Sequence, residues 1–229
     1  METIGHLSKF IINLIAKIVS KSRRFLILFS QVFFYHARYW QIYKWDGNQF
    51  KMPAPHFIKQ TVLLRSLIRN STIIESGTHK GDTALLLTKI SNRVITIEPD
   101  SNLFRLAEKR FSKMNTIRVI HGSSEQVFPE LLPELHGNMS FWLDGHYSGI
   151  GTYKGITDSP IITELAEIKK NLKSYNKVCI LIDDVRCFNP KIVEYVNYPE
   201  LNYLVKWAME NNFNWYIEHD IFIAKNFEI

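Results

Sequence analysis

The sequence predicts an α/β fold with a doubly wound sheet of seven strands, mostly parallel, which ends in an antiparallel hairpin and follows N-terminal helices. The first observation is that strand-like apolar runs alternate with helix-like stretches from residue 72 onward, which is typical of a parallel sheet with helices on both faces. The second is that the last two strand-like runs, 214–218 and 221–225, are separated only by His219 and Asp220. Two residues can join strands only as antiparallel neighbours.

Composition indicates a globular protein. The chain has 229 residues, of which 46% are hydrophobic, enough for one domain with a large core and an appendage. Its cysteines, Cys179 and Cys187, have no metal-ligand spacing, which favours a reducing, cytoplasmic setting without disulfides. Residues 1–40 contain six Lys or Arg and one Glu, an excess of +5 in a net charge of +6. The rest of the chain is nearly neutral, so we expect no nucleic acid partner.

The basic segment 1–40 also has apolar residues at helical intervals, among them Leu7, Ile11 and Leu14. Its longest uncharged run, 25–35, is shorter than the roughly 20 residues that a bilayer requires. No small-residue cleavage site follows it, which disfavours a signal peptide. Two interpretations remain: helices that pack on the main domain or on a second subunit of a homo-oligomer, and a peripheral element on an anionic inner membrane face.

A connector with Gly47, Pro53 and Pro55 separates this extension, residues 1–50, from the main domain, residues 51–229. The main domain is predicted to begin with a helix at 56–69. The elements expected before the hairpin are strand 72–76, helix 82–90, strand 94–98, helix 101–112, strand 117–121, helix 124–134, strand 139–144, helix 160–173, strand 177–183 and helix 199–211.

The first of these strands runs into a glycine-spaced loop and then a helix. Such a loop lets the backbone approach a ligand closely and points a helix N-terminus at it. Gly77 and Gly81 are three residues apart, which fits neither the phosphate-binding loop nor the dinucleotide fingerprint. Glu75 precedes the first glycine by two residues, and Glu98 ends the next strand. A carboxylate at that strand end can accept hydrogen bonds from both ribose hydroxyls of a nucleoside.

The pattern Glu-x-Gly-x-x-x-Gly with a downstream Glu resembles motif I and the acidic strand end of class I S-adenosylmethionine-dependent methyltransferases. The resemblance implies a Rossmann-like sheet with an antiparallel hairpin and S-adenosylmethionine as cofactor. It assigns cofactor binding to residues of the loop, the strand ends and the turn after the third strand, namely Glu75, Gly77, Thr78, Gly81, Glu98, Ser123 and Asp144. The alternative for Ser123 is a helix N-cap.

Three carboxylates close two neighbouring strands: Asp144 ends the strand 139–144, and Asp183 and Asp184 follow the next one. Such carboxylates repel one another unless a cation joins them, and a site with only oxygen ligands suits Mg²⁺. The arrangement resembles the metal-dependent O-methyltransferases of the catechol and macrolide-sugar types, which implies Asp144, Asp183 and Asp184 as metal ligands. The alternative is that each acid only caps a strand or a helix.

The residues after Asp144 depart from both types. Tyr147 stands where catechol-type enzymes have a lysine, and His146 stands where sugar-type enzymes often have an aspartate. His146 is therefore the candidate general base, with Asp144 as the second catalytic residue. The alternative for His146 is a hydrogen bond that only holds the loop, and Lys154 and Asp158 are weaker candidates for the base.

Four of the ten glycines fall at 145–155. This density predicts a loop that closes over the acceptor, or one that is simply irregular. The sequence thus predicts an S-adenosylmethionine-dependent O-methyltransferase, assisted by Mg²⁺, whose acceptor is a sugar hydroxyl on a glycan or glycolipid precursor. The alternatives are metal-independent methylation of another small molecule and a non-catalytic methyltransferase-like binding module.

Overall fold

The computed structural model describes residues 31, 33–48, 51–145 and 159–228 and divides into two units, Met1–Pro55 and His56–Ile229. Most of the predicted amphipathic extension, residues 1–30, lies outside the described residues. In the first unit, residues 33–47 are helical, and the Trp45 indole donates a hydrogen bond to the main-chain oxygen of Met52. Within the described part of the chain, no helix has the length and apolar character that a membrane span requires.

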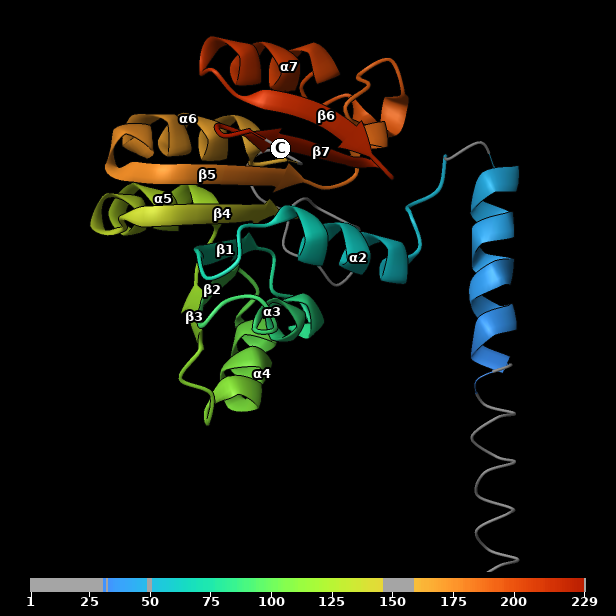
Figure 1. Ribbon diagram of the computed structural model, residues 1–229, viewed down its shortest axis with the longest axis horizontal. Helices are drawn as coiled ribbons and strands as arrows, with labels where there is room; N and C mark the ends of the chain where they lie inside the picture. Colours follow the sequence, from blue (N-terminus) through green and yellow to red (C-terminus); the bar gives the residue numbers. More distant parts are fainter. Residues whose placement is uncertain (1–30, 32, 49–50, 146–158, 229) are drawn as a thin grey trace, which may run out of the picture. The chain divides into compact units, whose positions relative to one another are not determined.

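The second unit is built on one seven-stranded sheet in the order β3-β2-β1-β4-β5-β7-β6 (Figure 1). The first five strands run parallel, whereas β7 is antiparallel to both β5 and β6. This arrangement confirms the predicted fold class, including the C-terminal hairpin. The strands are β1 (Thr72–Ser76), β2 (Arg93–Glu98), β3 (Ile117–His121), β4 (Gly137–Leu143), β5 (Tyr175–Ile182), β6 (Asn214–Glu218) and β7 (Ile221–Lys225).

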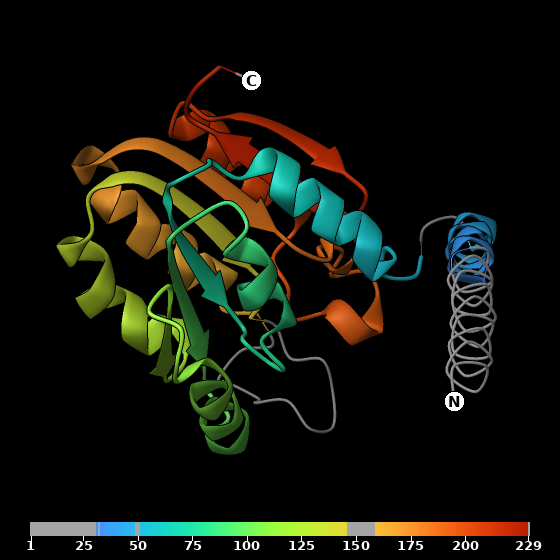
Figure 2. The ribbon, with the colours of Figure 1, turned by 60° about the horizontal axis from the view of Figure 1, so that its bottom comes forward.

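Helices cover both faces of the sheet (Figures 1 and 2). One face packs against α2 (His56–Ser66), α3 (Asp82–Leu87) and α4 (Ser101–Phe111). The other packs against α5 (Ser124–Leu131), α6 (Ile161–Asn171) and α7 (Leu201–Glu210). Because successive residues of a strand point to opposite faces, the buried neighbours Ile73 and Ile74 of β1 belong to different cores. This double burial explains why the strands read as continuous apolar runs.

Several predicted helices end earlier than the sequence pattern suggested. The helix expected at 82–90 stops at Leu87, where the N–H groups of Lys89 and Ile90 bind carbonyls three residues back and close a turn. The helices expected at 124–134 and 160–173 finish as short 3₁₀ turns, η1 (Leu132–Glu134) and η2 (Leu172–Ser174). Two further 3₁₀ turns, η3 (Val185–Cys187) and η4 (Val193–Tyr195), lie between β5 and α7.

The C-terminal hairpin turn also helps to position the end of β5. His219 and Asp220 have φ angles of 48° and 71°, the left-handed conformation that a two-residue hairpin turn requires. The Asp220 carboxylate accepts hydrogen bonds from the backbone N–H of Arg186, at 2.8 Å, and from its guanidinium. The segment that follows β5 is therefore fastened to the hairpin.

Candidate active site

The glycine loop after β1 is tied to the neighbouring strands. The backbone N–H groups of Gly77 and Thr78 donate to the main-chain oxygen of Ile97 in β2, at 3.0 and 3.2 Å. Gly77 has a φ of +92°, and a Cβ there would lie 2.7 Å from the main-chain oxygen of Asp144. Only glycine therefore allows the loop to approach the end of β4 this closely.

Glu98 at the end of β2 faces this loop. One carboxylate oxygen accepts from the His79 N–H at 2.7 Å, and the other accepts from the Asp100 N–H at 3.0 Å. Burial raises the pKa of Glu98, while these two backbone donors oppose the rise. A carboxylate oxygen can accept two hydrogen bonds, so with respect to the described residues each oxygen retains one acceptor position. Two such positions suit a pair of neighbouring hydroxyls, as a ribose offers.

Glu75 lies beneath the loop and is fully buried. It accepts a hydrogen bond from the Thr96 hydroxyl at 2.6 Å, and that hydroxyl is 2.6 Å from the Thr78 hydroxyl. Burial raises the pKa of Glu75 to about 8. Its second oxygen has no hydrogen-bond partner among the described residues. This unpartnered carboxyl oxygen beside the loop is a polar group that a bound ligand could pair with.

A cavity of about 220 Å³ opens beside the loop, at the carboxyl ends of β1, β4 and β5. Four predicted site residues line it together: Gly77, Thr78, Asp144 and Asp183. The loop itself adds His79 and Lys80, and α2 and α3 contribute the remaining polar lining, which consists of His56, Lys59, Gln60, Asp82 and Thr83. A polar pocket at the strand ends is where an open α/β sheet binds its ligand.

Other predicted residues lie elsewhere. Gly81 contacts α4, because a Cβ there would lie 2.6 Å from the Phe111 ring. Ser123 is the N-cap of α5, and its backbone N–H donates to the Gln126 side chain at 3.3 Å. This position agrees with the alternative interpretation of Ser123 as a cap. His146, Lys154, Asp158 and the glycine-rich segment 149–155 lie outside the described residues.

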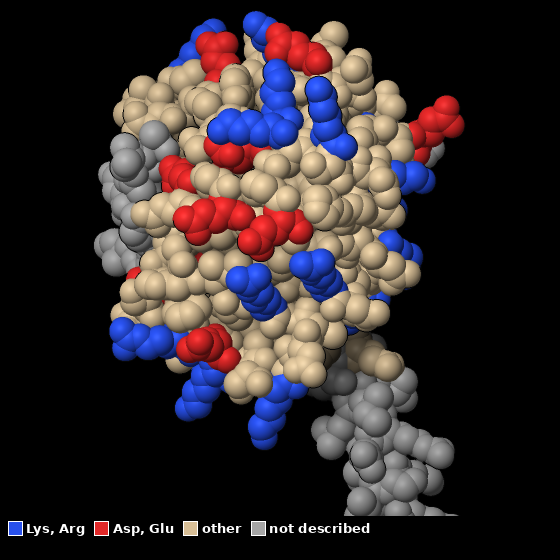
Figure 3. All heavy atoms as spheres, turned by 90° about the vertical axis from the view of Figure 1, so that its left-hand side faces the viewer, with Lys and Arg blue, Asp and Glu red and all other residues tan. Residues whose placement is uncertain are grey.

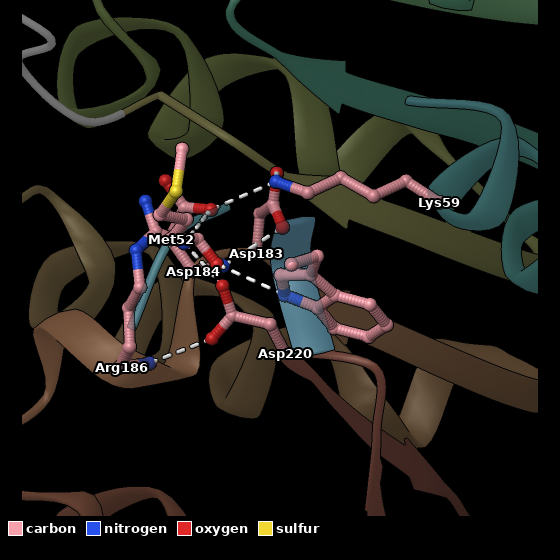
Figure 4. A network of polar contacts seen from close by, with 7 residues as sticks. Met52, Lys59, Asp183, Asp184, Arg186 and Asp220 are labelled. Carbon is pink, nitrogen blue, oxygen red and sulfur yellow. Dashed lines mark hydrogen bonds and ion pairs between the residues drawn. The ribbon is translucent and has the colours of Figure 1, made fainter. Parts of the chain in front are cut away.

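The two aspartates that follow β5 contact two basic side chains. Lys59 of α2 places its ammonium 2.6 Å from Asp183 and 2.8 Å from Asp184 (Figure 4). The Arg186 guanidinium lies 2.6 Å from Asp184 and also pairs with Asp220. Burial, together with Asp144 and Asp184, raises the pKa of Asp183, which Lys59 partly offsets. Burial alone would lower the pKa of Lys59, but the two carboxylates outweigh it and raise that pKa.

This donor set does not fit the predicted magnesium site. The Lys59 ammonium already lies between Asp183 and Asp184, where a metal ion would bind, and the second Asp183 oxygen accepts a hydrogen bond from the Asp184 N–H at 2.8 Å. Asp184 accepts from both Lys59 and Arg186 through one oxygen. In the described ranges no three His, Cys, Asp or Glu side chains are arranged to hold a metal ion. The magnesium expectation is therefore not supported: the positive charge that the carboxylates require comes from the side chains of Lys59 and Arg186.

The sequence interpretation missed four charged residues around the site. Arg186 carried a local signal, since it follows Asp184 by two residues, but Lys59 and Asp220 are distant in sequence and carried none. Glu164 of α6 is buried, and one of its oxygens lacks a partner among the described residues. Burial raises the pKa of Glu164 to about 7, while the Ser124 and Ser76 hydroxyls oppose the rise.

Sequence comparisons give one curated relative and no family match. No protein-family model matches the chain. The rRNA adenine N-6-methyltransferase of Escherichia coli is 34% identical over 64 residues, which are 28% of this chain. The match spans 26%, about a quarter, of the length of that relative.

Several solved structures are similar to this chain at low identity. A methyltransferase of Streptococcus mutans, SMU.1697c, in complex with S-adenosylhomocysteine has a TM-score of 0.47 and 15% identity over 76% of this chain and 97% of its own. The N-methyltransferase NodS of Bradyrhizobium japonicum has a TM-score of 0.49 and 14% sequence identity, and the match covers 73% of this chain and 92% of NodS. An rRNA methylase of Streptococcus thermophilus has a TM-score of 0.43 and 14% sequence identity, and the match covers 73% of this chain and 92% of the methylase.

The strand order decides the fold class. A sheet ordered β3-β2-β1-β4-β5-β7-β6 with an antiparallel β7 has the parallel strands and hairpin that the sequence resemblance implied. The fold is that of class I S-adenosylmethionine-dependent methyltransferases. The narrower resemblance to the metal-dependent sugar and catechol O-methyltransferases is not supported, because Asp183 and Asp184 are paired with Lys59 and Arg186 and the described residues contain no group of side chains arranged to hold a metal ion.

The prediction that nucleic acid is not a partner is wrong in the light of the curated match, which is to an enzyme named for rRNA adenine. The prediction rested on the near-neutral charge of residues 41–229. Net charge sums over the whole surface and does not report how charges are distributed near a cleft. On the face drawn in Figure 3, basic and acidic side chains are interspersed, and this face lies away from the carboxyl ends of the strands.

Proposed function

We propose that the protein is an S-adenosylmethionine-dependent methyltransferase. One observation carries this proposal: the Glu75–Gly81 loop is fastened against the Glu98 carboxylate at the ends of β1 and β2, beside a cavity that reaches Asp144 and Asp183. A nucleoside-containing cofactor would occupy this edge of the sheet, and the free acceptor positions of Glu98 suit its ribose. When bound, S-adenosylmethionine supplies an electrophilic methyl group on a sulfonium.

The charges of the site favour a cationic cofactor. The cluster contains four carboxyl groups, those of Asp144, Asp183, Asp184 and Asp220, and two basic side chains, those of Lys59 and Arg186. Because carboxyl groups outnumber basic groups in it, the cluster favours a positive ligand such as a sulfonium. The backbone of Gly77 and Thr78 and the carboxylate of Glu98 would hold the cofactor, with Glu75 and Gly81 supporting the loop and Ser123 at the turn after β3.

The first acceptor class that we propose is a sugar hydroxyl. The carboxylates of Asp144 and Asp183 line the cavity together and can accept hydrogen bonds from neighbouring hydroxyls. Removal of the hydroxyl proton by a carboxylate or an imidazole makes the oxygen a better nucleophile. Asp144, with His146 two residues later, remains our proposal for this role, without a metal ion.

A nucleic acid is the second candidate acceptor, and the curated match to an rRNA adenine methyltransferase is the observation that favours it. That enzyme is named for adenine N-6, an exocyclic amino group, so the acceptor atom in this second candidate is a base nitrogen and not a sugar oxygen. The two acceptor classes differ in size and charge, and a direct assay distinguishes them.

The assay incubates the purified protein with tritiated S-adenosylmethionine and, separately, ribosomal RNA or a glycan and glycolipid extract. We expect label in one of the two fractions. Asp144→Asn should reduce the label by about 100-fold, because it removes the proposed proton acceptor. Glu108→Gln, a substitution of an exposed residue of α4, is the matched control and should leave the label unchanged. Label in RNA alone selects the second candidate, and no label in either fraction contradicts both acceptor classes.

A further inference from the structure

The contacts of Lys59 suggest a specific role for this residue. Its ammonium bridges Asp183 and Asp184, which follow β5, although it comes from α2, more than a hundred residues away in sequence (Figure 4). The side chain is 13% exposed, against 3% and 8% for the two carboxylates, so the bridge lies at the edge of the cavity. It therefore occupies the position between two carboxylates where a hard cation would bind.

We propose that Lys59 is a built-in cation of this site, which takes the place of a divalent metal ion and holds the Asp183 carboxylate against the cavity beside Asp144. Lys59 is then a positioning residue, since it acts through Asp183. This role goes beyond the proposed methyl transfer. It is tested by cation binding, which can be measured whether or not the protein transfers methyl groups.

The neighbouring carboxylates of Asp183 and Asp184 require a positive charge. Two carboxylates this close and this buried would repel each other strongly without a cation. Lys59 supplies one positive charge in direct contact with both, and a divalent ion could reach the same oxygens only by displacing it. Removing Lys59 takes away the basic side chain that contacts Asp183, whereas Asp184 still pairs with Arg186. The site should then gain affinity for a divalent cation that replaces the lost charge.

Apolar packing holds α2 against the sheet. Val62 and Leu63 of α2 are buried in the same core as Trp142 and Leu181 of β4 and β5. This packing holds the helix against the sheet independently of the ion pair. The backbone of Lys59 should therefore remain in place when its side chain is shortened.

The test measures Mn²⁺ binding by electron paramagnetic resonance, with Mg²⁺ as competitor, in the full chain. The wild type should show no saturable binding at this site. Lys59→Ala should bind Mn²⁺ at least about tenfold more tightly than the wild type, lose that binding in the Lys59→Ala/Asp183→Asn double variant, and gain thermal stability with MgCl₂. Lys59→Arg keeps the charge and should behave as the wild type.

Arg65→Ala is the matched control, because Arg65 lies on the same helix and forms an exposed pair with Glu218. It should leave Mn²⁺ binding unchanged. Wild-type binding that Asp183→Asn removes would overturn the inference, as would a folded Lys59→Ala protein without binding. Lys59→Gln provides a second neutral variant. If both neutral variants fail to fold even with Mg²⁺ present, a divalent ion cannot replace the ammonium and the inference is also wrong.

Discussion

Gly77→Ala is expected to lower the free energy of unfolding by about 2–4 kcal/mol and to abolish measurable binding of S-adenosylhomocysteine. Two effects add at this position. The φ of +92° strains any L side chain, and the new Cβ would lie 2.7 Å from the main-chain oxygen of Asp144. The loop can relieve the clash only by moving away from β4, which pulls its backbone away from the cavity.

Gly137→Ala is the matched control for this substitution. Gly137 has a similar φ of +87°, but a Cβ there meets no atom within 4 Å among the described residues. Gly137→Ala should lower the free energy of unfolding only through the backbone strain, by about 1–2 kcal/mol, and should leave the affinity for S-adenosylhomocysteine unchanged. Chemical denaturation and calorimetry measure both quantities. Equal effects of the two substitutions would show that the contact with Asp144 does not position the loop.

Stability of the ligand-free protein is expected to fall as pH rises from about 5 to about 8. The pKa values of Glu75 and Glu164 are raised from 4.5 to about 8 and about 7. Between those limits the unfolded chain has released each proton while the folded protein retains it, so raising the pH favours unfolding. Each group contributes a slope of about 1.4 kcal/mol per pH unit within its own window. The stabilisation from each carboxyl is fully present below its pKa in the unfolded chain, and it is lost as the pH rises through its pKa in the folded protein.

Denaturation curves at a series of pH values test this prediction. Glu75→Gln and Glu164→Gln replace a titrating carboxyl by a neutral group of the same shape, so each should flatten the pH dependence. The flattening of the pH dependence by Glu75→Gln should extend to a higher pH than that by Glu164→Gln, because the pKa of Glu75 is the higher of the two. Glu108→Gln changes an exposed carboxyl and should leave the slope as it is in the wild type. An unchanged slope in both buried variants would show that these carboxyls ionise normally in the folded protein.

The strands of the sheet were predictable because short sequence patterns within and beside each strand indicate where it begins and ends. Both hairpin strands match the residues expected from sequence, since the two intervening residues allow only one geometry. β1 and β3 also match, each bounded by polar or turn residues. Helix ends were less predictable: α3 stops at Leu87, and the Ile90 carbonyl accepts a hydrogen bond from the N–H of Asn70, which lies before β1 and distant in sequence.

The site was predictable only in part, for a related reason. Strand-end residues such as Asp144 and Asp183 meet because parallel strands share one edge, which sequence order reveals. Their counter-charge does not follow from that rule. Lys59 reaches Asp183 and Asp184 from α2, and no spacing or periodicity near Lys59 distinguishes it from other helix lysines. The sequence interpretation therefore assigned a metal ion to the position between Asp183 and Asp184 that the Lys59 side chain occupies.

Isothermal titration calorimetry with S-adenosylhomocysteine tests the central claim most directly. The wild type should bind one equivalent, and Glu98→Ala should bind about tenfold or more weakly, because it removes the carboxylate proposed to accept from the ribose hydroxyls. Glu108→Ala should bind as the wild type. No binding by the wild type, or the same affinity in Glu98→Ala, would contradict the account of this site as a methyl-donor pocket.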